Sequence, residues 1–304
     1  MSVKIKVCYA IKEVESFIAR HRNSKFILYL AHKDKEDWEK STSRVYMNQI
    51  SPQLIYLPVN IEKDDLESLR QIYKISQNNE QIIATNQTQP HKSNAVMKEL
   101  FRNLTNIPVN IDAIIENQKG ELSPYDLNGP AFVDWFVDEV DVLTDKFIIL
   151  IGVGGAGEPI ARQIVLNKPS QLLLVDLVDK RYLAKELHSN DTVVRYSREL
   201  PSSSMIDKTS LVVINAAGKE GVENDSVVSA LLASNKNKQH VFVDLRPQLL
   251  LPIAEQAKKF GWKAYTGYGM NAINNYAFLC KALKIVGIKP PLFASFRKLV
   301  ASAS

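Results

Sequence analysis

The stretch at residues 146–165, KFIILIGVGGAGEPIARQIV, constrains the fold of this chain more than any other. An apolar run of strand length is followed by Gly152, Gly154 and Gly157, and Pro159 then suits the first turn of a helix. A strand that is apolar at nearly every position is buried on both faces, as in a parallel sheet covered by helices. The stretch therefore predicts a strand, a tight glycine turn and a helix within a parallel α/β domain.

Five more segments of the second half have the composition of buried strands. They read QLLLVDL, TVVRYS, SLVVINAA, HVFVDL and WKAYTG. Such a series is typical of a doubly wound parallel sheet with helices on both faces. We therefore predict a Rossmann-type dinucleotide-binding domain at residues 131–269.

The first half also alternates strands and helices. The apolar runs VKIKVCYAI, KFILYLA, QLIYLPVNI and EQIIAT are separated by KEVESFIARH, KEDWEKSTSRVYMNQI and KDDLESLRQIYKIS, whose spaced apolar residues suit amphipathic helices. A hairpin is expected around Lys119-Gly120, followed by a connecting helix that starts near Pro130. These patterns predict an α/β substrate domain at residues 1–130. We expect the C-terminal helix, residues 270–304, to pack back on that domain, with the tail from Phe296 frayed.

Composition narrows the class of protein. Of 304 residues, 45% are hydrophobic and 23% charged, and no apolar run has the length of a membrane span or the form of a signal peptide, so we expect a cytoplasmic protein without membrane partners. The net charge of +5 is scattered among acidic residues, which favours a small anionic metabolite over nucleic acid. Cys8 and Cys280 lack metal-ligand spacing, so we interpret them as core thiols and expect no metal site. A monomer or homodimer is expected.

The glycine turn carries the cofactor signal. A GxGxxG between a strand and a helix lets the backbone approach a pyrophosphate at the helix N-terminus, although the glycines could instead serve close packing alone. Asp176 ends the next strand, where a carboxylate reaches the ribose hydroxyls and repels a 2′-phosphate; Asp179 is a competing acid. NAD is therefore favoured over NADP. The predicted cofactor residues are Gly152, Gly154, Gly155, Ala156, Gly157 and Asp176, together with Asn215, Ala216 and Ala217 at the end of a later strand.

A second signal lies in the polar turn NQTQPHK, residues 86–92, between an apolar run and a helix. Asn, Thr and Pro are ordinary turn residues, so the turn taken alone has a purely structural explanation. A partly buried lysine can also exchange a proton with a hydroxyl that neighbouring Asn and Thr side chains orient. The rest of the chain decides between the two interpretations.

Together with the glycine turn, this motif resembles the shikimate/quinate dehydrogenase family. NQTQPHK is similar to the family's Asn-Val-Thr-x-Pro-His-Lys, and STSRVYMN to its Ser-x-Ser carboxylate motif. PVNI offers the next substrate asparagine, YDLNGPAF is similar to Asn-Thr-Asp-Gly-x-Gly-Phe, and GYGMNAINNYAF to Gly-x-Gly-Met followed by a Gln and an Ala-Phe pair. These landmarks follow the family's order from about residue 26 to residue 287.

The resemblance implies a lysine at the rim of an interdomain cleft, which takes the proton of a substrate hydroxyl while hydride passes to the nicotinamide. The substrate would be a cyclic hydroxy acid related to shikimate or quinate, as in aromatic amino acid biosynthesis. Carried over residue by residue, the resemblance assigns catalysis to Lys92 and Asn128, substrate binding to Ser41, Ser43, Asn86, Thr88, Asn110 and Asn274, and further cofactor contacts to Gly267 and Met270.

The chain departs from the family at several of these positions. Asn128 stands where the family has the aspartate partner of the lysine, Asp126 stands where it has Asn, and Asn274 replaces a Gln. The segment RPQLLLPIAEQA lacks the family's Tyr-x-Pro element. Because an amide replaces the carboxylate, we expect Lys92 to act without a carboxylate partner.

The cofactor strand departs too. Asp176-Leu177-Val178 stands where many members of the family have Asn-Arg-Thr, whose arginine suits the NADP phosphate, and this is similar to the NAD-using branch of the family.

Two other functions remain open. One is a catalytically impaired paralogue that binds nucleotide and ligand as a sensor or scaffold. The other is a dehydrogenase for a different carbocyclic or amino-substituted substrate.

Overall fold

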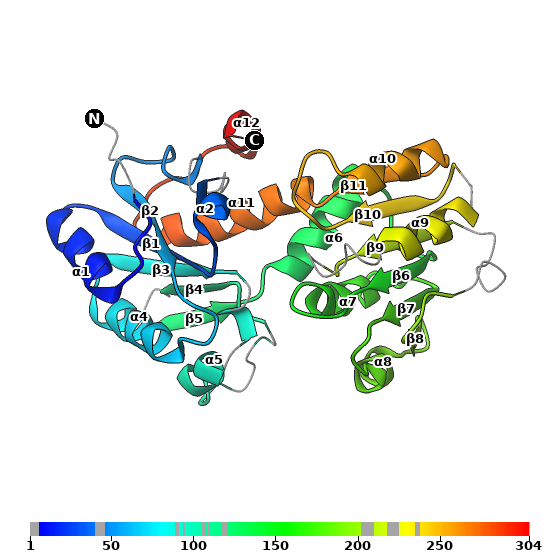
Figure 1. Cartoon of the computed structure of the whole chain (residues 1–304), viewed down its shortest axis with the longest axis horizontal. Helices are drawn as coiled ribbons and strands as arrows, with labels where there is room; N and C mark the ends of the chain where they lie inside the picture. The colour runs from blue at the N-terminus through cyan, green and yellow to red at the C-terminus, as the bar shows by residue number, and fades with distance from the viewer. Residues whose placement is uncertain are drawn as a thin grey trace. The chain divides into compact units, whose positions relative to one another are not determined.

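The computed structural model describes residues 6–39, 46–88, 91–93, 95–104, 108, 110–116, 121–201, 210–217, 225–234 and 238–303. The chain divides into two compact units. Unit 1 comprises Met1–Leu127 and Asn275–Ser304, and unit 2 comprises Asn128–Asn274 (Figure 1).

Unit 1 contains a five-stranded sheet in the order β2-β1-β3-β4-β5. β1, β2 and β3 are parallel, whereas β4 runs antiparallel to β3 and β5 antiparallel to β4. The elements of the first segment of the unit are α1 (Ile11–Arg20), β1 (Lys25–Ala31), α2 (Lys35–Glu39), β2 (Leu54–Asn60), α4 (Leu66–Asn78), β3 (Ile82–Gln87), the 3-10 helix η1 (His91–Ser93), α5 (Ala95–Leu100), β4 (Ala113–Glu116) and β5 (Leu122–Tyr125).

Helices cover the sheet of unit 1 because its strands are apolar on both faces. One face packs alternate β1 residues, Phe26, Leu28 and Leu30, against apolar residues of α1, α4 and α5. The intervening residues of β1 are buried too, and Tyr29 packs edge-on against Trp38 of α2. The strands and helices predicted to alternate in the first half of the chain thus form a mixed sheet with helices packed on it.

Unit 2 contains a six-stranded parallel sheet in the order β11-β10-β9-β6-β7-β8. Its elements are α6 (Asn128–Glu139), β6 (Phe147–Ile151), α7 (Gly157–Val165), β7 (Gln171–Val175), α8 (Arg181–Leu187), β8 (Val193–Ser197), β9 (Leu211–Asn215), α9 (Asp225–Ser234), β10 (Val241–Asp244), α10 (Pro252–Lys259) and β11 (Lys263–Thr266). The helix α11 (Tyr268–Ile285) begins in unit 2 and ends in unit 1, where α12 (Phe293–Ala303) follows it.

Two apolar cores sandwich the sheet of unit 2. Ile148 and Leu150 of β6 pack with α6, α7 and α8, and the alternate residues Phe147, Ile149 and Ile151 pack with α9 and α10. This two-sided burial explains the continuous apolar strands of the sequence. The predicted fold class is confirmed: an α/β domain with a mixed sheet and a second domain with a doubly wound, Rossmann-type parallel sheet.

Two local expectations were wrong. In the described part of the predicted first strand, from residue 6, only Cys8 forms a β-bridge and α1 begins at Ile11; residues 3–5 lie outside the described residues. The helix predicted for residues 35–50 is helical at residues 35–39, which form α2, and at residues 46–47, whereas residues 40–45 lie outside the described residues. The tail is not frayed: α12 buries Phe296 and Val300, and Phe296 packs on Tyr46 and Tyr276.

None of the helices in the described part of the chain combines the length and the apolar character that a membrane span requires.

The start of α4 gives a stability prediction. Asp65 is its N-cap and accepts a hydrogen bond from the Ser68 amide at 3.0 Å; the hydrogen bonds from Ser68 lower the pKa of the Asp65 carboxyl. Asp65→Ala should reduce the free energy of unfolding by about 1 kcal/mol at neutral pH, measured by urea denaturation. Because the folded-state pKa is depressed, this contribution is present above the usual carboxyl range and disappears as the pH falls through the folded value. The exposed neighbour Asp64→Ala is the control, and an equal loss in both variants would contradict the cap assignment.

Candidate functional site

The strand directions of unit 1 gather polar residues at one edge of its sheet. The carboxyl end of β3 pairs with the start of β4, and the start of β4 pairs with the end of β5, through Asn86, Ala113 and Tyr125. The predicted residues Asn86, Thr88, Lys92 and Asn110 all lie at or directly beyond this edge. Ser41 and Ser43, predicted to bind the substrate carboxylate, lie outside the described residues.

Asn86 is held in place from β2. The Tyr56 hydroxyl donates to Asn86 Oδ1 at 3.2 Å, both residues are buried, and burial raises the pKa of Tyr56 well above its usual value, so the hydroxyl keeps its proton. Because the amide oxygen accepts this hydrogen bond, the Nδ2 donors of Asn86 are the groups available to orient a ligand.

Backbone and ring contacts fix the turn after β3. The Thr88 amide donates to the Leu30 carbonyl at 3.1 Å, and the His91 amide donates to the Thr88 carbonyl at 2.8 Å. The buried His91 ring contacts the Ile61 carbonyl through Nε2 at 3.1 Å, and burial lowers the His91 pKa. His91 is therefore a neutral structural residue of the turn at physiological pH, and Lys92 follows it in η1.

Lys92 has a carboxylate partner, contrary to the expectation from its motif. Its ammonium Nζ contacts Oδ1 of Asp112 in an ion pair whose side chains are 16% and 3% exposed. Sequence reasoning missed Asp112 because the motif places the family's aspartate at Asn128. A signal was available: an acid directly before the buried strand β4 requires a partner, and β4 starts at the edge where Lys92 lies.

In unit 2, the predicted glycine turn connects β6 to α7. Gly152 has φ +81°, which favours glycine, and a Cβ on Gly157 would lie 1.9 Å from the Gly152 carbonyl oxygen. A Cβ on Gly154 would meet nothing within 4 Å. The first turn of α7 has no side-chain cap at Ala156. A glycine with open space beside it and an uncapped helix start fit the phosphates of a dinucleotide.

Asp176 lies beside this turn. Its Oδ2 accepts from the Val153 amide at 2.6 Å, and its Oδ1 accepts from the Val178 amide at 2.8 Å. The competing acid, Asp179, is exposed and forms an ion pair with Arg181, whose hydrogen bonds lower the Asp179 pKa to about 2. Asp176, not Asp179, therefore contacts the glycine turn.

Ala216, Ala217 and Gly267, which were also predicted to contact the cofactor, lie along the same carboxyl edge. The Ala216 amide donates to the Ile151 carbonyl at 2.7 Å, and a Cβ on Gly152 would lie 2.7 Å from backbone atoms of Ala217. The Gly267 amide donates to the Asp244 carbonyl at 2.6 Å. Met270 is buried in the core shared by α6 and α7. It contributes to packing of the unit.

A buried cluster of charged and polar side chains lies at this edge, and it was not predicted from the sequence. The Asp244 side chain has no exposed surface and receives the Arg246 guanidinium on both oxygens, at 2.9 and 2.8 Å. Asn215 Nδ2 donates to Asp244 Oδ2 at 2.8 Å. Asn215, predicted to contact cofactor, is thus also a structural link between β9 and β10.

Asn128 and Asn274, predicted to serve catalysis and substrate binding, contact each other within unit 2. Asn274 Nδ2 donates to Asn128 Oδ1 at 3.2 Å. Asn128 is the first residue of α6, and Asn274 lies in the first part of α11. An amide pair therefore stands where the family has a carboxylate and a glutamine amide. Lys92, the other predicted catalytic residue, belongs to unit 1.

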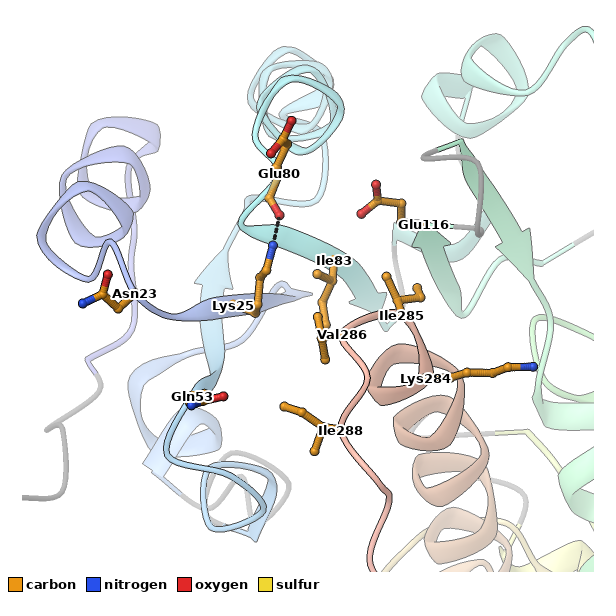
Figure 2. Close-up of a pocket in the computed structure, with 10 residues that line it drawn as sticks. All are labelled: Asn23, Lys25, Gln53, Glu80, Ile83, Glu116, Lys284, Ile285, Val286 and Ile288. Atoms are coloured by element: carbon orange, nitrogen blue, oxygen red, sulfur yellow. Dashed lines mark hydrogen bonds between the residues drawn. The ribbon is translucent and has the colours of Figure 1, made fainter.

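A cavity of about 670 Å³ occurs elsewhere in unit 1 (Figure 2). It lies at the amino ends of β1 and β3, where Lys25 Nζ donates to the Glu80 carbonyl at 2.8 Å, and residues at the end of α11, such as Lys284 and Ile285, complete its wall. Because the predicted substrate residues lie at the opposite edge of the sheet, this cavity is separate from their site.

Known proteins resemble this chain in sequence and fold, although no family model matches it. A shikimate dehydrogenase (NADP(+)) of Alkaliphilus oremlandii is 24% identical over 238 residues, which cover 71% of this chain and 76% of the relative. One of Methanococcus maripaludis is 22% identical over 231 residues, covering 71% and 77%.

Solved structures share the fold over most of the chain. A shikimate dehydrogenase in complex with NADP+ superposes with a TM-score of 0.70 at 20% identity, covering 92% of this chain and 96% of that one. A shikimate 5-dehydrogenase of Listeria monocytogenes with shikimate and NAD gives 0.68 at 15% identity, covering 91% and 96%. A quinate dehydrogenase of Corynebacterium glutamicum with NAD gives 0.66 at 13% identity, covering 92% and 99%.

The buried Asp244–Arg246 pair gives a prediction. Arg246→Leu would leave a buried carboxylate without its cation and should reduce the free energy of unfolding by about 3–5 kcal/mol, measured by urea denaturation. Adding Asp244→Asn should recover part of the loss, because it removes the uncompensated charge. Asp179 and Arg181 have the same sequence spacing but are exposed, so Arg181→Leu should cause no measurable loss. A stable Arg246→Leu protein would contradict this account.

Proposed function

For this chain, which is shikimate dehydrogenase-like in sequence and fold, we propose the function of an oxidoreductase that transfers a hydride between a nicotinamide dinucleotide and a ring hydroxyl or ketone of a cyclic hydroxy acid. The observation that carries the proposal is the Lys92 turn at the carboxyl edge of β3, with Asn86 and Thr88 beside it in the sequence. Two proteins similar to this chain in sequence are shikimate dehydrogenases by name.

The proposed substrate is an acid related to shikimate or quinate. Solved structures of the same fold hold shikimate in one protein, and another is a quinate dehydrogenase. In our proposal, Ser41 and Ser43 bind the substrate carboxylate, and the Nδ2 donors of Asn86 orient a ring hydroxyl. Thr88, Asn110 and Asn274 are the other proposed substrate-binding residues.

Lys92 is the proposed acid/base. During oxidation its neutral amine accepts the hydroxyl proton, and in reduction its ammonium returns a proton to the new alkoxide. A bound nicotinamide would supply the hydride acceptor or donor. Asn128, an amide with no proton to exchange, would position the substrate by hydrogen bonds.

NAD is the proposed cofactor. The glycine turn and the start of α7 would hold the pyrophosphate, and Asp176 would accept hydrogen bonds from the adenosine ribose. The names of the sequence relatives include NADP(+), whereas the Listeria and Corynebacterium structures hold NAD. The choice therefore rests on Asp176, whose carboxylate would repel a 2′-phosphate.

The competing proposal is a paralogue that binds nucleotide and ligand without turnover. The amide at Asn128 favours it, because the family has a carboxylate there. A thermal-shift screen with NAD, NADP, shikimate, quinate and their keto forms, followed by assays of NADH formation, separates the two: both functions predict stabilisation by ligands, and only the enzyme predicts NADH.

The cofactor proposal predicts that NAD binds more tightly than NADP. Asp176→Asn should narrow the difference in Kd, measured by calorimetry, because it removes the charge that opposes the 2′-phosphate. Affinity for NAD should also fall, since an amide cannot accept from both the Val153 and the Val178 amides as the carboxylate does. Asp179→Asn removes a comparable charge from the exposed competitor and should leave the ratio unchanged. Tighter NADP binding by the unaltered protein would refute the proposal.

The acid/base proposal predicts a loss of turnover on Lys92→Met. General acid/base groups contribute about a hundredfold to ten-thousandfold, so kcat should fall by that factor while the Kd for NAD changes little. Lys25→Met, at the opposite edge of the same sheet, is the matched control and should retain turnover. Unchanged turnover in Lys92→Met would return the turn to a purely structural role.

A further inference from the structure

Asp112 is the acid that faces Lys92, and it comes from a part of the sequence that the motifs do not mark. It lies directly before β4, two residues after Asn110, with its side chain 3% exposed. One carboxylate oxygen pairs with Lys92 Nζ, and the other accepts the Leu127 amide at 2.9 Å. Both oxygens of the buried carboxylate therefore have a donor.

Backbone hydrogen bonds fix both partners. The Ile111 amide donates to the Lys92 carbonyl at 2.8 Å, and the Asp112 amide donates to the Tyr125 carbonyl at 2.9 Å. The Gln87 amide donates to the Asp112 carbonyl at 2.8 Å. Asp112 is thus joined to the ends of β3 and β5, and its neighbour is joined to the lysine turn. Such a frame allows little movement of the carboxylate relative to the Lys92 backbone.

The contact with Leu127 also connects the pair to the residue before Asn128. In the family pattern the position of Asn128 carries the carboxylate for the lysine. Here the Asp112 carboxylate accepts a hydrogen bond from the amide of Leu127, the residue before position 128. It contacts Lys92 from the start of β4, whereas position 128 follows β5, the other strand of the hairpin. The charge that the motif lacks at residue 128 is therefore present in unit 1.

We propose that Asp112 is the positioning residue of Lys92: it holds Nζ in one place and stabilises the ammonium that forms when the amine takes the substrate proton. This inference rests on the proposed function. The hydroxyl proton passes to the neutral amine, and the carbon that bears this hydroxyl would give its hydride to a bound nicotinamide, which converts the alcohol to a ketone. The Lys92 ammonium then releases this proton to water, because the Lys92 side chain is partly exposed. Asp112 exchanges no proton.

A labelling experiment tests the pair without requiring any turnover. Acetic anhydride reacts with neutral amines, and a nearby carboxylate favours the charged form of a lysine. In Asp112→Asn, which keeps the shape and can still accept the Leu127 amide, Lys92 should be acetylated at least about threefold faster at neutral pH, measured by mass spectrometry of the folded protein. Glu116→Gln removes a carboxylate at the far end of β4 and should leave the rate unchanged. Equal rates in Asp112→Asn and the unaltered protein would overturn the inference.

Kinetics then separate positioning from a purely structural role. Asp112→Glu keeps the charge and the ion pair but moves it by one methylene, so acetylation should stay slow while kcat falls by roughly ten- to a hundredfold with KM nearly unchanged. Full kcat in this variant would overturn positioning, and because it retains the buried charge pair it remains testable if Asp112→Asn fails to fold.

A second-site variant supplies the rescue. Asn128→Asp can still accept the Asn274 amide and restores a carboxylate at the family's position, so adding it to Asp112→Asn should recover part of the lost kcat and shift the pH profile. No recovery would mean that Asp112 acts only through the fold. If the unaltered protein forms no NADH with any substrate, the enzyme proposal fails by itself, while the acetylation rates still decide whether Asp112 controls Lys92.

Discussion

Parallel strands buried on both faces leave one place for polar chemistry, the edge where the strands end. In unit 2 the continuous apolar strands force helices onto both faces, so that the glycine turn, Asp176 and the backbone around Gly267 can occur only at the carboxyl edge. In unit 1 the reversal of β4 means that the connection between β3 and β4 begins and ends at the edge where β1 and β3 end. That reversal allows an acid before β4 to meet a lysine after β3.

Strong periodicity made the architecture predictable from sequence. Apolar strands of four to seven residues, helix-spaced apolar residues and a glycine turn all indicate two α/β units, one of them with a doubly wound parallel sheet. The ends of the chain were less predictable. The segment from Phe296 was predicted to be frayed, yet Phe296 and Val300 are buried, and Phe296 packs against Tyr46 and Tyr276.

Residues of the candidate site could be predicted where the backbone conformation requires a particular residue type. They were not predicted where the motif specifies only the partner of a side chain. Gly152 could be identified because its positive φ requires glycine. The motif did not identify the partner of Lys92, since it names one sequence position for the carboxylate, whereas several backbone positions can bring a carboxylate to the same point in space. The Asp244–Arg246 pair was hidden for the same reason: its spacing is identical to that of the exposed pair Asp179–Arg181, and burial alone distinguishes them.

The short segment around Cys8 has a consequence for association between molecules. β2 is an edge strand, and an open edge invites strands from other chains. Here the Cys8 amide donates to the Pro58 carbonyl at 3.0 Å, and the Asn60 amide donates to the Cys8 carbonyl at 2.8 Å, while Pro58 itself has no amide hydrogen to offer. Burial raises the Cys8 pKa to about 11, so its thiol stays protonated within the apolar layer. A second molecule could extend the sheet at β2 only after displacing the segment around Cys8.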